Sequence, residues 1–138
     1  MTRTAQCSCG ALRVEVEGEP GAVVLCHCTE CQCRTGSVFG VGAYFPADKV
    51  KCTGANTAYT RVMEGRKFTS HFCPTCGTSL YWEAELVPGA IGVAVGGFRD
   101  SNFPRPTRAV WEEKRHHWVT LGAEIPGHLQ GRTSKTVR

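Results

Sequence analysis

Residues 26–31 of the chain read CHCTEC and place three cysteines within one short segment. Side chains alternate between two faces of an extended chain, so the thiols of Cys26 and Cys28 point the same way. Cys31 returns to them three residues later, so this segment can offer three thiolates to a single ion. His27 points to the opposite face, where it is either a donor supporting the metal ligands from behind or an ordinary buried imidazole satisfied by the backbone.

Two further cysteine pairs lie far apart in the sequence. Cys7 and Cys9 form a C-x-C pair, whose thiols share one face of an extended chain. Cys73 and Cys76 form a C-x-x-C pair followed by Gly77, and this spacing bends the chain into a knuckle around a tetrahedral zinc ion. Because the triple must serve one ion, the pairs are left for another. The predicted four-cysteine group is Cys7, Cys9, Cys73 and Cys76, and the predicted three-cysteine group is Cys26, Cys28 and Cys31.

The two groups predict two zinc ions with different roles. Four thiolates close a zinc ion completely, which is typical of a structural site, whereas three leave one position for water or substrate. We therefore expect the chemistry, and the catalytic residues, at Cys26, Cys28 and Cys31. Cys33 is predicted to point away from Cys31 on a helical turn, and Cys52 is predicted to be a small buried residue within a strand.

The length of 138 residues favours one domain, because the 16 glycines and 7 prolines are spread along the chain and do not form a linker. We expect a zinc-binding β domain over residues 1–126. The remaining residues, 127–138, contain basic side chains and no acid, so they are predicted to form a loose basic tail.

The first residues lack the apolar run of a signal peptide, and no segment approaches the ~20 apolar residues of a membrane span. We therefore expect a soluble, cytoplasmic protein with no membrane partner, and in that reducing compartment nine cysteines indicate metal ligands and not disulfides. Two zinc ions and seven thiolates would change the formal charge of +4 to +1. The charge therefore does not predict binding to nucleic acid.

Residues 12–17 alternate apolar and charged side chains and end at Gly18, which predicts a half-exposed strand. Short apolar or aromatic segments separated by Gly, Pro or Asn follow, which predicts a mainly β fold of short antiparallel sheets. We expect little helix: one turn from Thr29 to Arg34 and one further candidate over residues 110–119.

The order and spacing of the cysteine groups, with residues 34–37 (RTGS) after the triple and Gly77-Thr78 after the last pair, resemble the glutathione-dependent formaldehyde-activating enzyme family, which includes centromere protein V. The resemblance covers roughly residues 5–120 and departs at Cys33, where the family usually carries another residue. It implies an Mss4-like fold, a structural zinc at the four-cysteine group and a catalytic zinc at the three-cysteine group. It also implies a carbon–sulfur lyase that joins glutathione to formaldehyde as S-(hydroxymethyl)glutathione.

Two alternatives stay open at this point. Thiols add to formaldehyde without a catalyst, so the open site could serve mainly as a carrier of glutathione or another small thiol. A zinc-stiffened interaction module is the other alternative. A zinc ion with three thiolates carries a net negative charge, which Arg34, Ser37 or backbone N–H groups would have to offset. Candidate bases are His71, His116 and His117, and the aromatic side chains Phe98, Phe103, Trp111 and Trp118 either pack in the core or line a pocket.

Overall fold

The computed structural model describes residues 1–138 and divides into two compact units. Unit 1 contains residues 1–21 and 43–103, and unit 2 contains residues 22–42 and 104–138. Each unit is therefore built from segments that are distant in the sequence. Residue 126, where the composition predicts the end of the folded domain, lies within unit 2. No helix is both long and apolar enough to cross a membrane.

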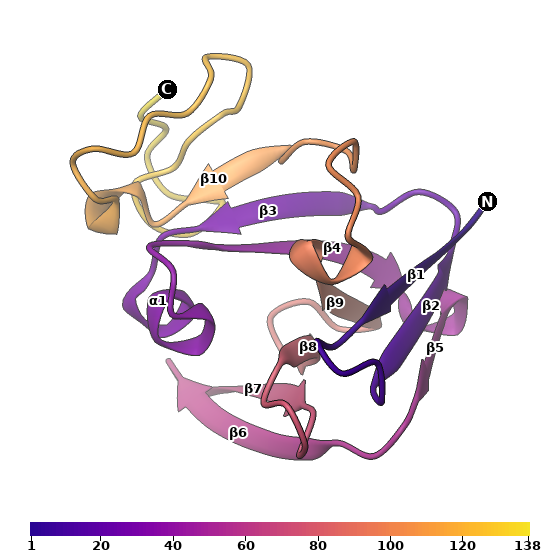
Figure 1. The fold of residues 1–138 in the computed structure, drawn as a ribbon. Coiled ribbons are helices and arrows are strands. Elements are labelled where there is room, and N and C mark those ends of the chain that lie inside the picture. The colour runs from indigo at the N-terminus through magenta and orange to yellow at the C-terminus, as the bar shows by residue number, and fades with distance from the viewer. The chain divides into compact units, whose positions relative to one another are not determined.

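Unit 1 begins with a small antiparallel sheet (Figure 1). Its three strands, in spatial order, are β1 (Thr2–Gln6), β2 (Arg13–Glu17) and β5 (Val50–Thr53). The alternation predicted for residues 12–17 is confirmed: Val14 and Val16 are buried, and the charged residues between and beside them are exposed. This alternation is typical of an antiparallel sheet with one face packed on the core and the other exposed to solvent.

The other antiparallel strands of unit 1 follow one another as a meander. They are β6 (Thr57–Met63), β7 (Arg66–Phe72), β8 (Ser79–Ala84) and β9 (Ala90–Ala94). A Cβ atom on Gly92 would collide with the indole of Trp82, so the sheet needs glycine beneath this ring. Trp82 Nε1 in turn donates to the Tyr44 hydroxyl at 3.1 Å.

Short helical turns and aromatic packing complete unit 1. The turns are η1 (Ala47–Lys49) and η2 (Val95–Phe98), and β4 (Gly40–Pro46) carries the chain from unit 2 into unit 1. Phe98 stacks on Phe103 with ring centroids 4.7 Å apart, and both side chains are buried. For these two aromatics, core packing is therefore the role that the structure shows.

Unit 2 contains a parallel pair of strands, β3 (Ala22–Cys26) and β10 (Arg108–Val110) (Figure 1). The sequence predicts antiparallel pairing, so this pair is a correction. Parallel neighbours need a long connection, and here the intervening residues, 27–107, supply it. The fold as a whole is mainly β and made of short strands, as predicted.

The α-helical structure is limited to one short element, in unit 2. The predicted turn at Thr29 is confirmed as α1 (Thr29–Thr35), which ends at Gly36 with a φ of 72°. The prediction over residues 110–119 is mostly wrong, because only η3 (Glu112–Lys114) forms there. The backbone N–H groups of Trp111, Glu112 and Glu113 donate to carbonyls of residues 128–130, so they are not available for an α-helix.

The C-terminal residues of unit 2 form backbone hydrogen bonds with β10 and with each other. Ala109 N–H donates to the Pro126 carbonyl at 2.8 Å, and His128 N–H donates back to Ala109 at 2.9 Å. Val137 N–H then donates to the Gly127 carbonyl at 2.9 Å, so the last residues fold back on this segment. The apolar core beneath consists of Leu25, Ala109 and Ile125, with Phe39, Val41 and Leu121 packed against it.

Candidate metal centres

Unit 1 brings the four-cysteine group together. All four Sγ atoms, of Cys7, Cys9, Cys73 and Cys76, lie within 4.8 Å of one another, and the Cys7–Cys9 and Cys9–Cys73 Sγ distances are both 3.7 Å. Zinc–sulfur bonds of about 2.3 Å in a tetrahedron place the sulfur atoms about 3.8 Å apart. The spacing of these thiols therefore fits one tetrahedral ion, and none of the nine cysteines forms a disulfide.

Two tight turns hold these thiols in place. Cys7 lies just after β1, where its Sγ accepts a hydrogen bond from Leu12 N–H at 3.2 Å. In the second turn, Gly77 has a φ of 79° and its N–H donates to the Cys73 carbonyl at 2.8 Å. The positive φ predicted for this glycine is confirmed, and it closes the knuckle that the C-x-x-C spacing predicts.

Thr78 joins the two turns, a role that the sequence reasoning missed. Its hydroxyl accepts from Ser8 N–H at 3.1 Å and lies 3.3 Å from Cys76 Sγ. Hydrogen bonds from the Thr78 hydroxyl and then from its backbone N–H lower the pKa of Cys76 to about 5. The only sequence signal for this role is the position of Thr78 directly after Gly77.

Cys9 resists ionisation next to its neighbouring thiols. The backbone N–H of Ala11 lowers the pKa of Cys9, but the Cys7 and Cys73 thiols outweigh it and raise that pKa to about 11. Neighbouring thiolates disfavour one another because like charges repel. A bound cation would remove this repulsion, so the donor set fits a metal ion in chemistry as well as in spacing.

Unit 2 brings the three-cysteine group together. The Sγ atoms of Cys26, Cys28 and Cys31 lie within 4.8 Å of one another, and all three residues are half-buried. Cys26 ends β3, whereas Cys28 caps the start of α1, with its Sγ accepting from Cys31 N–H at 3.4 Å. The strand end and the first helical turn thus present three thiols at one point.

These three thiols are also crowded. The Cys28 thiol, then the Cys31 thiol and burial, raise the pKa of Cys26 far above its ordinary value. Cys26 itself lowers the pKa of Cys31, but Cys28 and burial outweigh it and the net shift is upward. A divalent cation is the charge that would hold all three as thiolates. These residues could therefore hold a metal ion, with one position not filled by this group.

Arg34 is the charged side chain that acts on this group from α1, where its guanidinium lowers the pKa of Cys31. A Cβ atom built on Gly40 would lie 2.8 Å from Arg34 Nη2 and 3.5 Å from Cys31 Cβ. The absence of a side chain at Gly40 therefore lets β4 pack closely against both residues. The charge-offset role of Arg34 stays a prediction, and the Ser37 N–H donates locally to the Thr35 hydroxyl at 3.0 Å.

His27 is not among the side chains whose ligand atoms gather at the three-cysteine group. Its side chain is fully buried, its ring is edge-on to Phe39, and neither ring nitrogen has a hydrogen-bond partner in the protein. Burial lowers the pKa of His27, which favours the neutral ring. It is therefore neither bonded to the backbone through its ring nor a donor to the cysteines.

The remaining candidates lie elsewhere. Cys33 is exposed, and Cys52 is exposed in β5, so the prediction that Cys52 is buried is wrong. Cys52 pairs with the buried Val14 in the register of β2 and β5, but β5 is an edge strand of this sheet, and Cys52 is left exposed there. Trp118 is 64% exposed, so it does not pack in the core.

The candidate bases are engaged differently. His71 contacts Asn56 Oδ1 through Nδ1 at 2.7 Å and Glu83 Oε2 through Nε2 at 2.6 Å, and its ring stacks on Tyr81. His116 Nε2 lies 3.0 Å from Gln32 Oε1, on the helix that carries Cys31. His117 is exposed. Both ring nitrogens of His71 are therefore occupied, whereas His116 is held next to the three-cysteine helix.

The fold and the two thiol groups define a small, β-rich protein with two all-cysteine sites that could each hold a metal ion. The model of the glutathione-dependent formaldehyde-activating enzyme family matches residues 2–114, so the chain belongs to this family. A crystal structure of a Rhodobacter sphaeroides protein is similar, with a TM-score of 0.58 and 27% identity. That match covers 72% of this chain and 90% of the other.

Proposed function

We propose that this chain is a zinc-dependent enzyme of the carbon–sulfur lyase type that joins glutathione to formaldehyde as S-(hydroxymethyl)glutathione. The family match supports glutathione and formaldehyde as the reactants. The observation that carries the proposal is the three-cysteine group, whose Sγ atoms lie within 4.8 Å and supply one ligand fewer than a closed zinc site needs.

Cys26, Cys28 and Cys31 would hold the catalytic ion. A zinc ion there would lower the pKa of an incoming thiol and favour its thiolate form. Arg34, which already acts on Cys31, would offset part of the negative charge that collects on four sulfur atoms. In the reaction the glutathione sulfur bonds to the formaldehyde carbon, the carbonyl oxygen becomes a hydroxyl, and the thiol proton ends on that oxygen. No other reactant is required.

Cys7, Cys9, Cys73 and Cys76 would hold a second, structural zinc ion. Four thiolates leave no position for substrate. The group joins two turns that are distant in the sequence, so its role is to stabilise unit 1. We place the protein in the cytoplasm, where reducing conditions keep cysteines available as metal ligands.

The test measures binding and rate separately, because the uncatalysed reaction is itself measurable. Glutathione is titrated into the zinc-loaded protein by calorimetry, and exchange between formaldehyde and its glutathione adduct is followed by NMR at equilibrium. We expect glutathione binding and faster exchange than in buffer, both lost in Cys28→Ser and both kept in Cys33→Ser, whose thiol is exposed.

Two results would contradict the proposal in different ways. Binding without faster exchange would support a thiol carrier, which is the alternative closest in chemistry. No binding of glutathione or another small thiol at millimolar concentration would favour a zinc-stiffened interaction module.

A further inference from the structure

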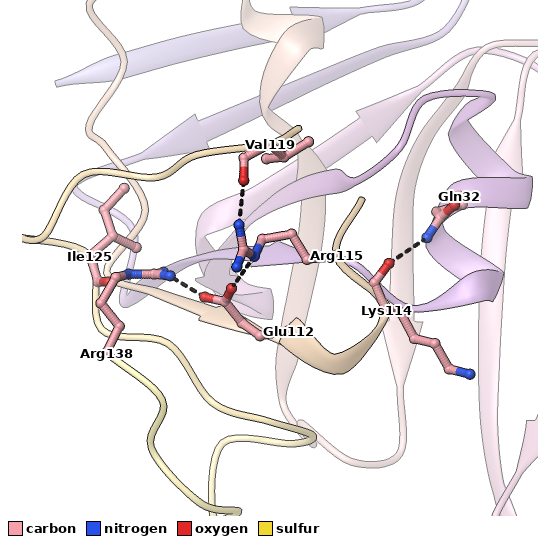
Figure 2. Close-up of polar contacts among 7 residues, drawn as sticks. All are labelled: Gln32, Glu112, Lys114, Arg115, Val119, Ile125 and Arg138. Atoms are coloured by element: carbon pink, nitrogen blue, oxygen red, sulfur yellow. Dashed lines mark hydrogen bonds and ion pairs between the residues drawn. The ribbon is translucent and has the colours of Figure 1, made fainter. Parts of the chain in front are cut away.

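Glu112 carries a buried carboxylate held between two arginines in unit 2 (Figure 2). Only 3% of its side chain is exposed. Oε1 lies 3.0 Å from Arg115 Nε, and Oε2 lies 2.6 Å from Arg138 Nη2. A carboxylate withdrawn from water needs such partners, so the position of each arginine is linked to that of Glu112.

The two arginines tie this carboxylate to the surrounding backbone. Arg138 Nε donates to the Ile125 carbonyl at 2.9 Å, and Arg115 donates to the Val119 carbonyl (Figure 2). A Cβ atom on Gly127 would collide with the Glu112 carboxylate. The glycine therefore lets the C-terminal segment approach Glu112, and Arg138 fastens that segment to η3.

The segment that carries Glu112, residues 110–114, also binds the backbone of the three-cysteine group through hydrogen bonds. His27 N–H, between Cys26 and Cys28, donates to the Val110 carbonyl at 3.1 Å. Gln32 Nε2 on α1 donates to the His27 carbonyl at 2.8 Å. It also donates to the Lys114 carbonyl at 3.4 Å (Figure 2). The backbone that carries Cys26 and Cys28 is thus held from both sides, by β10 and by the helix that carries Cys31.

His27 lies between Cys26 and Cys28 in the sequence, and its imidazole is fully buried and packs against Phe39. The ring has no hydrogen bonds of its own, so its position depends on what packs around it. Glu112 and Lys114 both belong to η3, so a displacement of Glu112 would move the carbonyls of residues 110–114 that hold His27 and Gln32.

We propose that Glu112 and Arg138 are positioning residues for the Cys26, Cys28 and Cys31 metal site, acting through residues 110–115, His27 and Gln32. The inference rests on the proposed metal-binding role of the three-cysteine group. On this proposal, Arg138 is the C-terminal basic residue that holds Glu112, and through Glu112 the turn behind the metal ligands. Groups that orient metal ligands from behind typically change metal affinity by about 10- to 100-fold when removed.

The experiment uses the full chain loaded with cobalt(II), which reports ligand geometry in its visible absorption. Arg138→Met removes the charge and keeps an apolar stem, Arg138→Lys keeps a charge, and Arg132→Met is the control because Arg132 is exposed. Cobalt affinity is measured for each site by chelator competition. The three-cysteine signal is identified by its absence from Cys28→Ser.

We expect Arg138→Met to lower the cobalt affinity of the three-cysteine site by about tenfold or more and to alter its absorption bands. The four-cysteine site, in unit 1, should be unchanged and serves as an internal reference. Arg138→Lys should recover part of the loss, Glu112→Gln should reproduce it, and Arg132→Met should match the unmodified protein.

Three results would overturn the inference. Unchanged affinity and absorption in Arg138→Met and Glu112→Gln would show that the ion pairs do not act on the metal ligands. Equal loss at both sites, together with loss of the far-UV signal, would show general destabilisation. A wild-type chain that binds cobalt only at the four-cysteine site would overturn the proposed function as well, and this result is distinguished from the first two because no variant is needed to see it.

Discussion

Cys9 and Cys73 place their Sγ atoms 3.7 Å apart although 64 positions separate them in the sequence. Cys7 and Cys73 are fully buried whereas Cys9 and Cys76 are exposed, so this junction lies where the core of unit 1 meets its surface. A metal ion there would close a long loop and add binding free energy that the unfolded chain does not gain.

Cys73→Ser should therefore lose one zinc ion and the folded state together. Apparent binding free energies of structural zinc are about 10–16 kcal/mol, whereas domains are typically stable by only about 5–15 kcal/mol. Zinc content and thermal unfolding test this, with Cys33→Ser as the control. A Cys73→Ser protein that kept its zinc content and its melting temperature would show that the assignment is wrong.

Chelation should remove the two ions in sequence. The three-cysteine site offers fewer protein ligands and takes them from one short segment, so its ion should leave first, with the fold intact and thiol binding abolished. The zinc-to-protein ratio and the far-UV spectrum are followed through the titration. Simultaneous loss of both ions and of the fold would contradict the division into two roles.

Gly40→Ala should weaken metal binding at the three-cysteine site without unfolding the chain. The new Cβ would lie 2.8 Å from Arg34 Nη2, so the guanidinium must move away from its place beside Cys31. We expect several-fold lower affinity in chelator competition. The control is Gly21→Ala, whose Cβ would meet only the Tyr44 carbonyl at 3.8 Å, an ordinary contact. Equal affinities for the two variants would argue against a role for Arg34.

Tyr81 should make the fold sensitive to alkaline pH. Burial, and then the Cys52 thiol, raise the pKa of Tyr81 to about 12, above its ordinary value of about 10. Between these values the folded state holds a proton that the unfolded state has lost, so the free energy of unfolding falls as pH rises from about 10. Denaturant unfolding of Tyr81→Phe should show a smaller decrease than the unmodified chain over this range. Parallel decreases in the two proteins would contradict the prediction.

The local features of this protein could be predicted from its sequence because they depend on neighbouring residues. Alternation in residues 12–17 predicts β2 and its buried face, and the C-x-x-C-G spacing predicts the knuckle with a positive φ at Gly77. The cysteine spacing also predicts the division of seven thiols into a group of four and a group of three, and the structure brings together the thiols of each group. Zinc binding by those groups stays a prediction.

Features that join distant segments were decided by the tertiary structure. The parallel pairing of β3 and β10, the exposure of Cys52 and the failure of a helix to form over residues 110–119 all depend on which segments pack together. Composition predicts that Arg138 belongs to a loose tail, yet its guanidinium contacts the buried carboxylate of Glu112. Periodicity encodes the conformation of one segment, whereas burial of a charge or the pairing of two strands depends on a partner that no local pattern identifies.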